Sequence, residues 1–530
     1  MSIIRKLASQ TAVYGLSSVI GRVVIWALTP VYTAMMSQSE YGIFSDLYSF
    51  VTYFLVILTF GMETSYFRYA SDKKEVKGAY TQAFLLIFFI AIAFSLLSIL
   101  AHKPLAEILG YAARSELVLM VIAIIGLDVI VALPMAKMRY DERPGLFAGV
   151  TIFSILLNLA LNAWFYIIMK RTEADYVFIS NLITSVARVC ILVLLSLPFL
   201  RKADQEGKSS AVSVADLLPV NFKLNKEIVF PMMQYGFFIM IAGLFGMINQ
   251  NSDVNFIKRI WGENRELFNG KFWNGDELAG IFAANKKLAI MILLFTQAFR
   301  YAAEPFFFKQ SDRSDSRIVF AKVFHYFMMA GIIVYLFVGS FSHELVSVSV
   351  FGFQLIDESY HSGLGVVPLL LFGFLLWGAY INISIWFKIT KQVRFGLLFS
   401  GIGTAIVVLF NIILIPFMGY YASALAMIAC YATMTAMVYI SGQKYFEVPY
   451  HLRRSAVYLA AATLILLIGF WIDGSAEVKF FSPEFWYKFL LAMAFLAGLA
   501  IMEKWKPAFP VKKSMESESS VSASPGKKTV

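Results

Sequence analysis

Residues 116–136 read ELVLMVIAIIGLDVIVALPMA, an apolar run in which Asp128 is the one acid after the leading Glu116. About 20 apolar residues form a helix long enough to cross the hydrocarbon core of a bilayer. Runs of this kind recur along all 530 residues, of which 59% are hydrophobic. The sequence therefore predicts an all-α polytopic membrane protein rather than a soluble domain.

About fourteen such runs are present. We expect membrane spans at 10–36, 41–62, 79–101, 116–136, 145–169, 176–199, 228–250, 279–304, 318–340, 364–387, 395–416, 419–440, 455–472 and 485–503. With the N-terminus inside, 30 of the 45 Lys and Arg residues fall on cytoplasmic segments, 10 on external ones and five within spans. Cytoplasmic loops carry the excess of Lys and Arg, so we expect both termini in the cytoplasm. The net charge of +11 then reflects membrane topology and does not indicate nucleic-acid binding.

The two halves of the chain repeat. The segment YGIFS at 41–45 corresponds to AGIFA at 279–283, and Tyr14-Gly15 corresponds to Tyr235-Gly236. Six spans separate the copies, which predicts two pseudo-symmetric, parallel six-helix lobes with a substrate site between them. The expected parts are an N-terminal lobe at 1–200, a cytoplasmic linker at 201–227, a C-terminal lobe at 228–445, two C-terminal helices within 446–505 and a disordered cytoplasmic tail at 506–530.

Four cations lie in the middle of apolar runs: Arg22, Arg188, Lys286 and Lys287. A charge at bilayer depth costs several kcal/mol, so it persists where it faces protein or a water-filled cavity. Guanidinium and ammonium groups bind phosphate oxygens well. We therefore predict a cationic cavity that binds a diphosphate, with Arg22 as the leading candidate.

The alternative interpretation is that each cation pairs with a buried acid. Asp46, Asp128 and Asp253 lie in or near spans and could neutralise these cations or couple transport to H+ or Na+. For Asp128, pairing with Arg22 or Arg188 is favoured over coupling. No metal-ligand spacing is present among the five histidines and two cysteines, so we expect no metal site and no cofactor.

Several stretches together resemble the polysaccharide, or oligosaccharide-lipid, flippases of the multidrug/oligosaccharidyl-lipid/polysaccharide exporter superfamily. They are SEYGIF at 39–44, NSDVNFIKRI at 251–260, AGIFAANKKLA at 279–289 and NIILIPFMGYYASALA at 411–426. One departure is Val254, which follows Asp253 where the family often has Arg. The resemblance spans about residues 5 to 450 and implies a non-enzymatic flippase that works by alternating access.

The resemblance also implies the cargo and the cellular setting. The cargo would be a polyprenyl-diphosphate-linked oligosaccharide, moved to the periplasmic leaflet of a bacterial cytoplasmic membrane for O-antigen, capsule or exopolysaccharide synthesis. Expected partners are this lipid-linked glycan, the bilayer, a polysaccharide polymerase and glycosyltransferases. The rival hypothesis is an ion-coupled antiporter of drugs or organic cations from the same superfamily, which would present acidic residues to its substrate. No GxxxxGK[ST] nucleotide loop is present, which disfavours ATP hydrolysis.

Overall fold

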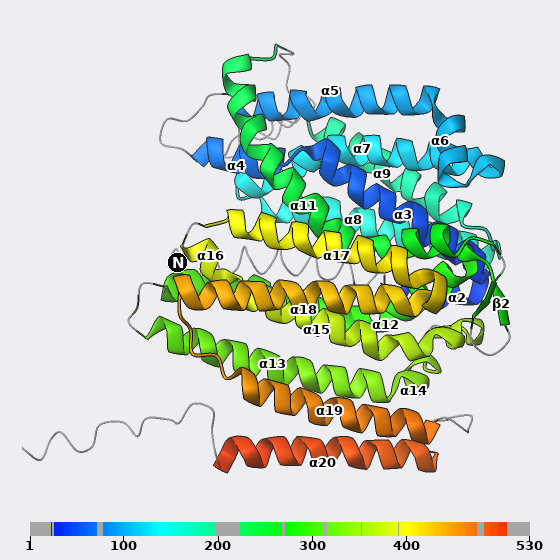
Figure 1. Ribbon diagram of the computed structural model, residues 1–530. Helices are drawn as coiled ribbons and strands as arrows, with labels where there is room; N and C mark the ends of the chain where they lie inside the picture. Colours follow the sequence, from blue (N-terminus) through cyan, green and yellow to red (C-terminus); the bar gives the residue numbers. More distant parts are fainter. Residues whose placement is uncertain are drawn as a thin grey trace, which may run out of the picture.

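The computed structural model is almost entirely helical (Figure 1). It describes residue 23 and residues 26–71, 78–196, 223–473 and 482–505, apart from positions 264, 268–270, 312, 314, 351 and 391. Thirteen helical segments within this part of the chain are long and apolar enough to cross a membrane. They coincide with thirteen of the fourteen expected spans. The remaining one, at 10–36, lies largely outside the described residues, as do most of the expected linker and the whole expected tail.

The N-terminal half carries the helices up to α9. They are α2 (Thr29–Met35), α3 (Gln38–Thr59), α4 (Met62–Ser71), α5 (Ala79–Leu100), α6 (His102–Leu109), η1 (Ala112–Arg114), α7 (Ser115–Tyr140), α8 (Pro144–Ala163), η2 (Trp164–Ile168) and α9 (Asp175–Leu195).

The C-terminal half begins at α11. Its elements are α11 (Lys226–Trp261), β1 (Arg265–Leu267), β2 (Lys271–Trp273), α12 (Gly275–Gln310), α13 (Ser316–Ser340), α14 (Ser342–Val346), β3 (Ser349–Val350), β4 (Phe353–Gln354), η4 (Glu358–Val366), α15 (Val367–Ile383), α16 (Ile385–Ile389), α17 (Arg394–Met418), α18 (Tyr420–Tyr445), α19 (Leu452–Asp473) and α20 (Pro483–Trp505).

The helix α11 is longer than the sequence analysis predicts. The expected spans 228–250 and 279–304 leave residues 251–278 as a connection, whereas the helix continues to Trp261 and a short β1–β2 hairpin follows. The polar side chains after 250 lie on a helix that packs against α3 and α12, so their polarity reflects contact with protein rather than a loop. At the start of α12, a capping box between Asn274 and Glu277 satisfies free backbone N–H groups.

Apolar side chains form two large hydrophobic cores. One lies mainly among α3, α4, α5, α6, α7 and α9 and includes Leu47 and Phe178. The other is built mainly from α11 to α20 and includes Phe282 and Phe374. Phe44 on α3 packs against both. In Figure 1 the helices of the first core lie above those of the second, with α19 and α20 at the lower edge. The lobe boundaries proposed from the sequence stay a prediction.

A pair of glycines relates the two halves. A Cβ atom at Gly42 would lie 3.0 Å from the backbone nitrogen of Gly280, and a Cβ atom at Gly280 would lie 3.0 Å from that of Gly42. The same hypothetical atoms would collide with the carbonyl oxygens of Asp276 and Gln38 respectively. Gly42 and Gly280 are related by the repeat's offset of 238 residues, and so are Gln38 and Asp276. Each of the helices α3 and α12 therefore meets the other through equivalent residues. Glycine permits the close approach that small residues give membrane helices.

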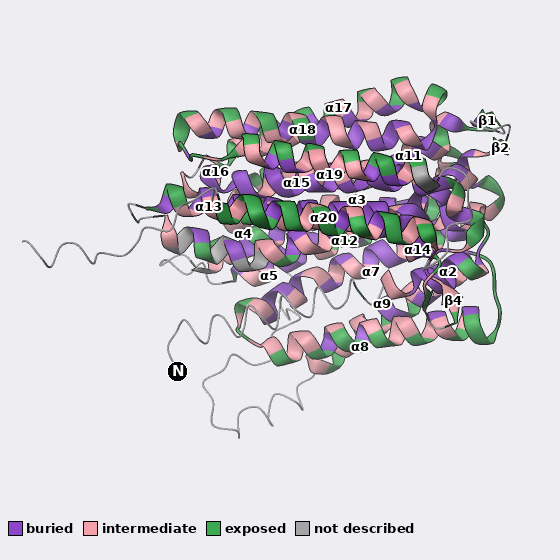
Figure 2. Cartoon of the chain, turned by 90° about the horizontal axis from the view of Figure 1, so that it is seen from below, coloured by how far each residue is buried: buried purple, intermediate pink, exposed green. Residues whose placement is uncertain are grey.

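The outer surface of the helix bundle is apolar. On α20 the exposed residues include Tyr487, Leu490 and Met493, and Figure 2 shows exposed positions along this helix. A lipid tail solvates such side chains, so their exposure is compatible with a membrane. The chain is a multi-pass membrane protein.

Candidate functional site

A cavity of about 160 Å³ lies where α3 meets α11 and α12. Four polar side chains of α3 line it, and their spacing of three and four residues puts them on one helical face: Ser45, Tyr48, Ser49 and Thr52. The other polar walls are Asn251 and Asp253 of α11, and Lys286 and Lys287 of α12. We call this the central cavity. The sequence analysis missed the polar stripe on α3, although its spacing was readable.

Lys286 is neutralised within the chain. Its Nζ donates to Oδ2 of Asp253 at 2.5 Å and to the backbone carbonyl of Gln250 at 2.6 Å. The side chains of Lys286 and Asp253 are each 12% exposed, so their attraction is weakly screened and offsets part of the cost of burying both charges. Asp253 therefore acts as a counter-ion here.

Lys287 has no carboxylate partner among the described residues. It lies near the middle of the membrane span Gly275–Arg300. The backbone carbonyl of Lys287 accepts a hydrogen bond from Nε1 of Trp26 at 3.0 Å, which ties the segment before α2 to this turn of α12. Among the residues that line the central cavity, two lysines and one aspartate leave one net positive charge. Such a charge favours an anionic ligand.

A second cavity, of about 120 Å³, lies among α3, α7, α8 and α9. Within it, Nη1 of Arg188 is 3.5 Å from Oδ1 of Asp128, and the hydroxyl of Ser185 donates to the same oxygen at 2.8 Å. The guanidinium also donates through Nε to the hydroxyl of Ser154 at 3.3 Å. The charge of Arg188 is thus offset inside the N-terminal half.

Tyr48 lines both cavities, and its hydroxyl donates to Oδ1 of Asn181 at 3.4 Å. The four predicted cations therefore do not share one described cavity. Lys286 and Lys287 lie together, Arg188 lies in the second cavity, and Arg22 lies outside the described residues.

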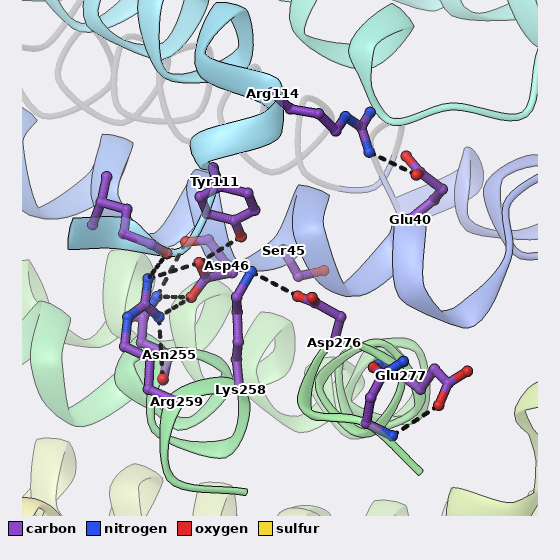
Figure 3. A network of polar contacts seen from close by, with 12 residues as sticks. Glu40, Ser45, Asp46, Tyr111, Arg114, Asn255, Lys258, Arg259, Asp276 and Glu277 are labelled. Atoms are coloured by element: carbon purple, nitrogen blue, oxygen red, sulfur yellow. Dashed lines mark hydrogen bonds and ion pairs between the residues drawn. The ribbon is translucent and has the colours of Figure 1, made fainter. Parts of the chain in front are cut away.

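A polar network joins α3 to α11 at one end of the helix bundle (Figure 3). Asp46 is fully buried and accepts two hydrogen bonds from Arg259, at 2.6 and 3.0 Å. Nδ2 of Asn255 donates to the same carboxylate at 2.6 Å, and the hydroxyl of Tyr111 donates at 2.7 Å. Burial and the Asp46 carboxylate raise the pKa of Tyr111 well above its ordinary value, so this hydroxyl stays protonated and donates. Asp46 therefore forms an ion pair with Arg259 in this structure.

Further ion pairs surround this network. Nζ of Lys258 lies 2.8 Å from Oδ1 of Asp276 and 3.6 Å from the ring centre of Tyr111 (Figure 3). Arg114 pairs with Glu40 at 2.7 Å and also with Asp175. We call these contacts and those of Asp46 the α3–α11 closure. Sequence analysis missed its cations because it assigned Lys258 and Arg259 to a loop.

No group of three or more His, Cys, Asp or Glu side chains in the described ranges is arranged to hold a metal ion. Of the two cavities described above, the central cavity is the one with a net cationic charge.

Comparison with solved structures identifies the class of fold. The lipid II flippase MurJ in an inward closed conformation is similar at a TM-score of 0.64, with 12% identity over 92% of this chain and 98% of that chain. An inward-facing multidrug resistance MATE family transporter of the MOP superfamily is similar at 0.58, with 14% identity over 80% and 94%. A mutant of the Vibrio cholerae MATE transporter VcmN is similar at 0.56, with 14% identity over 83% and 96%. The fold is that of the polytopic MOP-superfamily transporters.

The family follows from the sequence match. Residues 7–310 match the model of the polysaccharide biosynthesis protein family, so the chain belongs to that family. No curated protein matches the chain.

Proposed function

We propose that this protein is a flippase that moves a polyprenyl-diphosphate-linked oligosaccharide from the cytoplasmic to the outer leaflet of a bacterial cytoplasmic membrane. The observation that carries this proposal is Lys287, an ammonium group without a described carboxylate partner in a polar cavity between two halves of a transporter fold. A diphosphate supplies the missing negative charge. Membership of a polysaccharide biosynthesis family supports a glycan as the cargo.

The α3–α11 closure supports a mechanism by alternating access. It connects helices that carry residues of the central cavity, and from the Lys and Arg distribution we expect it at the external end of the bundle. Opening this end requires separation of Asp46 from Arg259 and of Gly42 from Gly280. We infer that these contacts hold the external side closed while the cavity receives cargo from the cytoplasmic side.

The driving force need not be a coupled ion. An interior-negative potential favours outward movement of an anion by roughly 2.3 kcal/mol per charge per 100 mV. Asp128 and Asp253 contact cations of the chain, which favours charge pairing over H+ or Na+ coupling. Flipping that persists undiminished after collapse of the potential and of ion gradients would refute this part of the proposal.

The similarity to MATE transporters supports one rival function, that of an antiporter of organic cations. Such a substrate needs an acidic site, whereas the acids of both described cavities already contact basic side chains. Proteoliposomes separate the two functions. We expect transfer of a labelled polyprenyl-diphosphate oligosaccharide between leaflets without ethidium transport; ethidium transport without lipid transfer would establish the rival.

The cytoplasmic location of both termini and contact with a polysaccharide polymerase and glycosyltransferases are parts of the same proposal. Cysteine accessibility at engineered sites in the loops just before Arg394 and just before Leu452 would test the side on which these loops lie.

A further inference from the structure

A groove between the last two helices combines basic and apolar side chains. A cavity of about 310 Å³ lies where α19 begins and α20 ends. We call it the α19–α20 groove; its walls are His451, Arg453, Arg454, Val457, Tyr458 and Met502. Helix α13 contacts both α19 and α12, and in Figure 1 α19 and α20 lie at the edge of the bundle. The groove is thus separate from the central cavity.

The groove carries more positive than negative charge. Nη1 of Arg454 is 3.6 Å from Oε1 of Glu503, too far for a hydrogen bond, and this buried nitrogen has no acceptor among the described residues. The same carboxylate oxygen already accepts from the hydroxyl of Tyr458 at 2.6 Å and lies 3.1 Å from Nε2 of His325. Arg453 has no ion-pair partner within the described part of the chain. The groove therefore has two guanidinium groups and one nearby carboxylate, and Glu503 pairs with Arg454 rather than with Arg453.

The start of α19 strengthens this positive field. The first backbone N–H groups of a helix point outward and carry partial positive charge. A phosphate placed between them and the guanidinium of Arg454 would supply the acceptor that the buried Nη1 lacks. The missing acceptor of this buried nitrogen therefore points to an anionic ligand in the groove.

The level of the groove in the membrane is marked by Trp505 at the end of α20, whose side chain is 81% exposed. Exposed tryptophans concentrate where hydrocarbon meets headgroups. Met502 and Val457, which line the groove, are each about half exposed. The basic side chains therefore lie at headgroup level with an apolar wall beside them. The charge bias of the loops puts this end on the cytoplasmic side, where anionic lipids attract basic segments.

We propose that the α19–α20 groove binds an anionic phospholipid of the surrounding bilayer. Its phosphate contacts Arg453 and Arg454, and an acyl chain lies against Val457 and Met502. The polyprenyl-diphosphate cargo shares this phosphate chemistry. The groove favours the bulk phospholipid over the cargo, because α13 separates the groove from the central cavity. A lipid that binds at the edge of the bundle need not pass through that cavity.

The test uses the full-length protein in detergent, titrated with phosphatidylglycerol or phosphatidylcholine and read by native mass spectrometry of retained lipid. We expect phosphatidylglycerol to be retained preferentially, and Arg453→Gln to weaken its binding about fivefold. The matched control is Arg394→Gln, because Arg394 is an exposed arginine that also begins a helix on the expected cytoplasmic side. The control should bind like the unchanged protein.

Arg453 makes no described ion pair, so its replacement tests the groove without disturbing the fold; Arg454→Gln adds a second variant that should lose a similar amount. Equal retention of both lipids, or an equal loss in Arg394→Gln, would overturn the proposal. Undecaprenyl diphosphate that displaces phosphatidylglycerol at far lower concentration, with the same dependence on Arg453, would reassign the groove to the cargo lipid. These outcomes are independent of flipping activity.

Discussion

Replacement of Arg259 by methionine tests the α3–α11 closure through the stability of the protein. The change leaves Asp46, which is fully buried, without its positive partner. Removal of one partner from a buried ion pair costs about 3 to 5 kcal/mol. We expect the lower end of this range, about 3 kcal/mol, because the side chain of Arg259 is 32% exposed and because Asn255 and Tyr111 still donate to the carboxylate.

A double-mutant cycle with Asp46→Asn isolates the ion pair. The asparagine carries no charge, so the double variant should recover about 2 kcal/mol relative to Arg259→Met alone. Apparent unfolding temperatures in one detergent, followed by intrinsic fluorescence, give the comparison. The control is Arg313→Met, which removes an exposed pair with Asp315 and should cost less than about 1 kcal/mol. Equal losses for Arg259→Met and Arg313→Met, or additive effects of Asp46→Asn and Arg259→Met, would refute the reasoning.

Three further outcomes are expected. Gly42→Ala should destabilise by about 1 to 3 kcal/mol because its methyl meets the backbone of α12, whereas Gly149→Ala, with open space around it, should be neutral or stabilising by thermal unfolding. Lys488→Met should cost about 3 to 5 kcal/mol because it leaves the buried Glu344 without the ammonium 2.5 Å away; retention of the full unfolding temperature would contradict this. The pKa of Tyr111 is raised in the folded state, so its protonated form stabilises the folded state at low pH, and this contribution fades as pH rises above about 10. Tyr111→Phe should therefore lose less stability than the unchanged protein between about pH 9 and 11. Identical curves of stability against pH for the two proteins would be evidence against this prediction.

Apolar length and loop charge predicted thirteen of the described spans because both properties are local in sequence. The pairing of charges could not be predicted in the same way. Asp46 and Arg259 lie more than 200 residues apart, and their contact depends on how α3 crosses α11. The segment NSDVNFIKRI reads as an external loop by composition, yet it is helical because its polar side chains meet polar partners on α3. Hydropathy alone does not distinguish water from a polar protein surface.

The role of the predicted site residues in cargo binding stays a prediction, but the structure shows where they lie. Lys286 and Lys287 line one cavity, whereas Arg188 lies in another and contacts Asp128, an alternative that the sequence left open. A buried cation looks the same in sequence whether a carboxylate or a ligand neutralises it. The spacing of Ser45, Ser49 and Thr52 predicts a polar face on α3, and the sequence analysis did not use it. In the structure this face lies opposite Lys286 and Lys287 in the central cavity.

The most direct test of the central claim is leaflet transfer of a labelled polyprenyl-diphosphate oligosaccharide in proteoliposomes containing Lys287→Gln, Lys287→Arg or Lys103→Gln. A charge-assisted contact to phosphate contributes about 1.5 to 3 kcal/mol, so Lys287→Gln should slow transfer about 10- to 150-fold. Lys287→Arg should retain much of the rate, and Lys103→Gln, at an exposed position on α6, should leave it unchanged. Transfer by a folded Lys287→Gln variant at the unchanged rate would contradict the account.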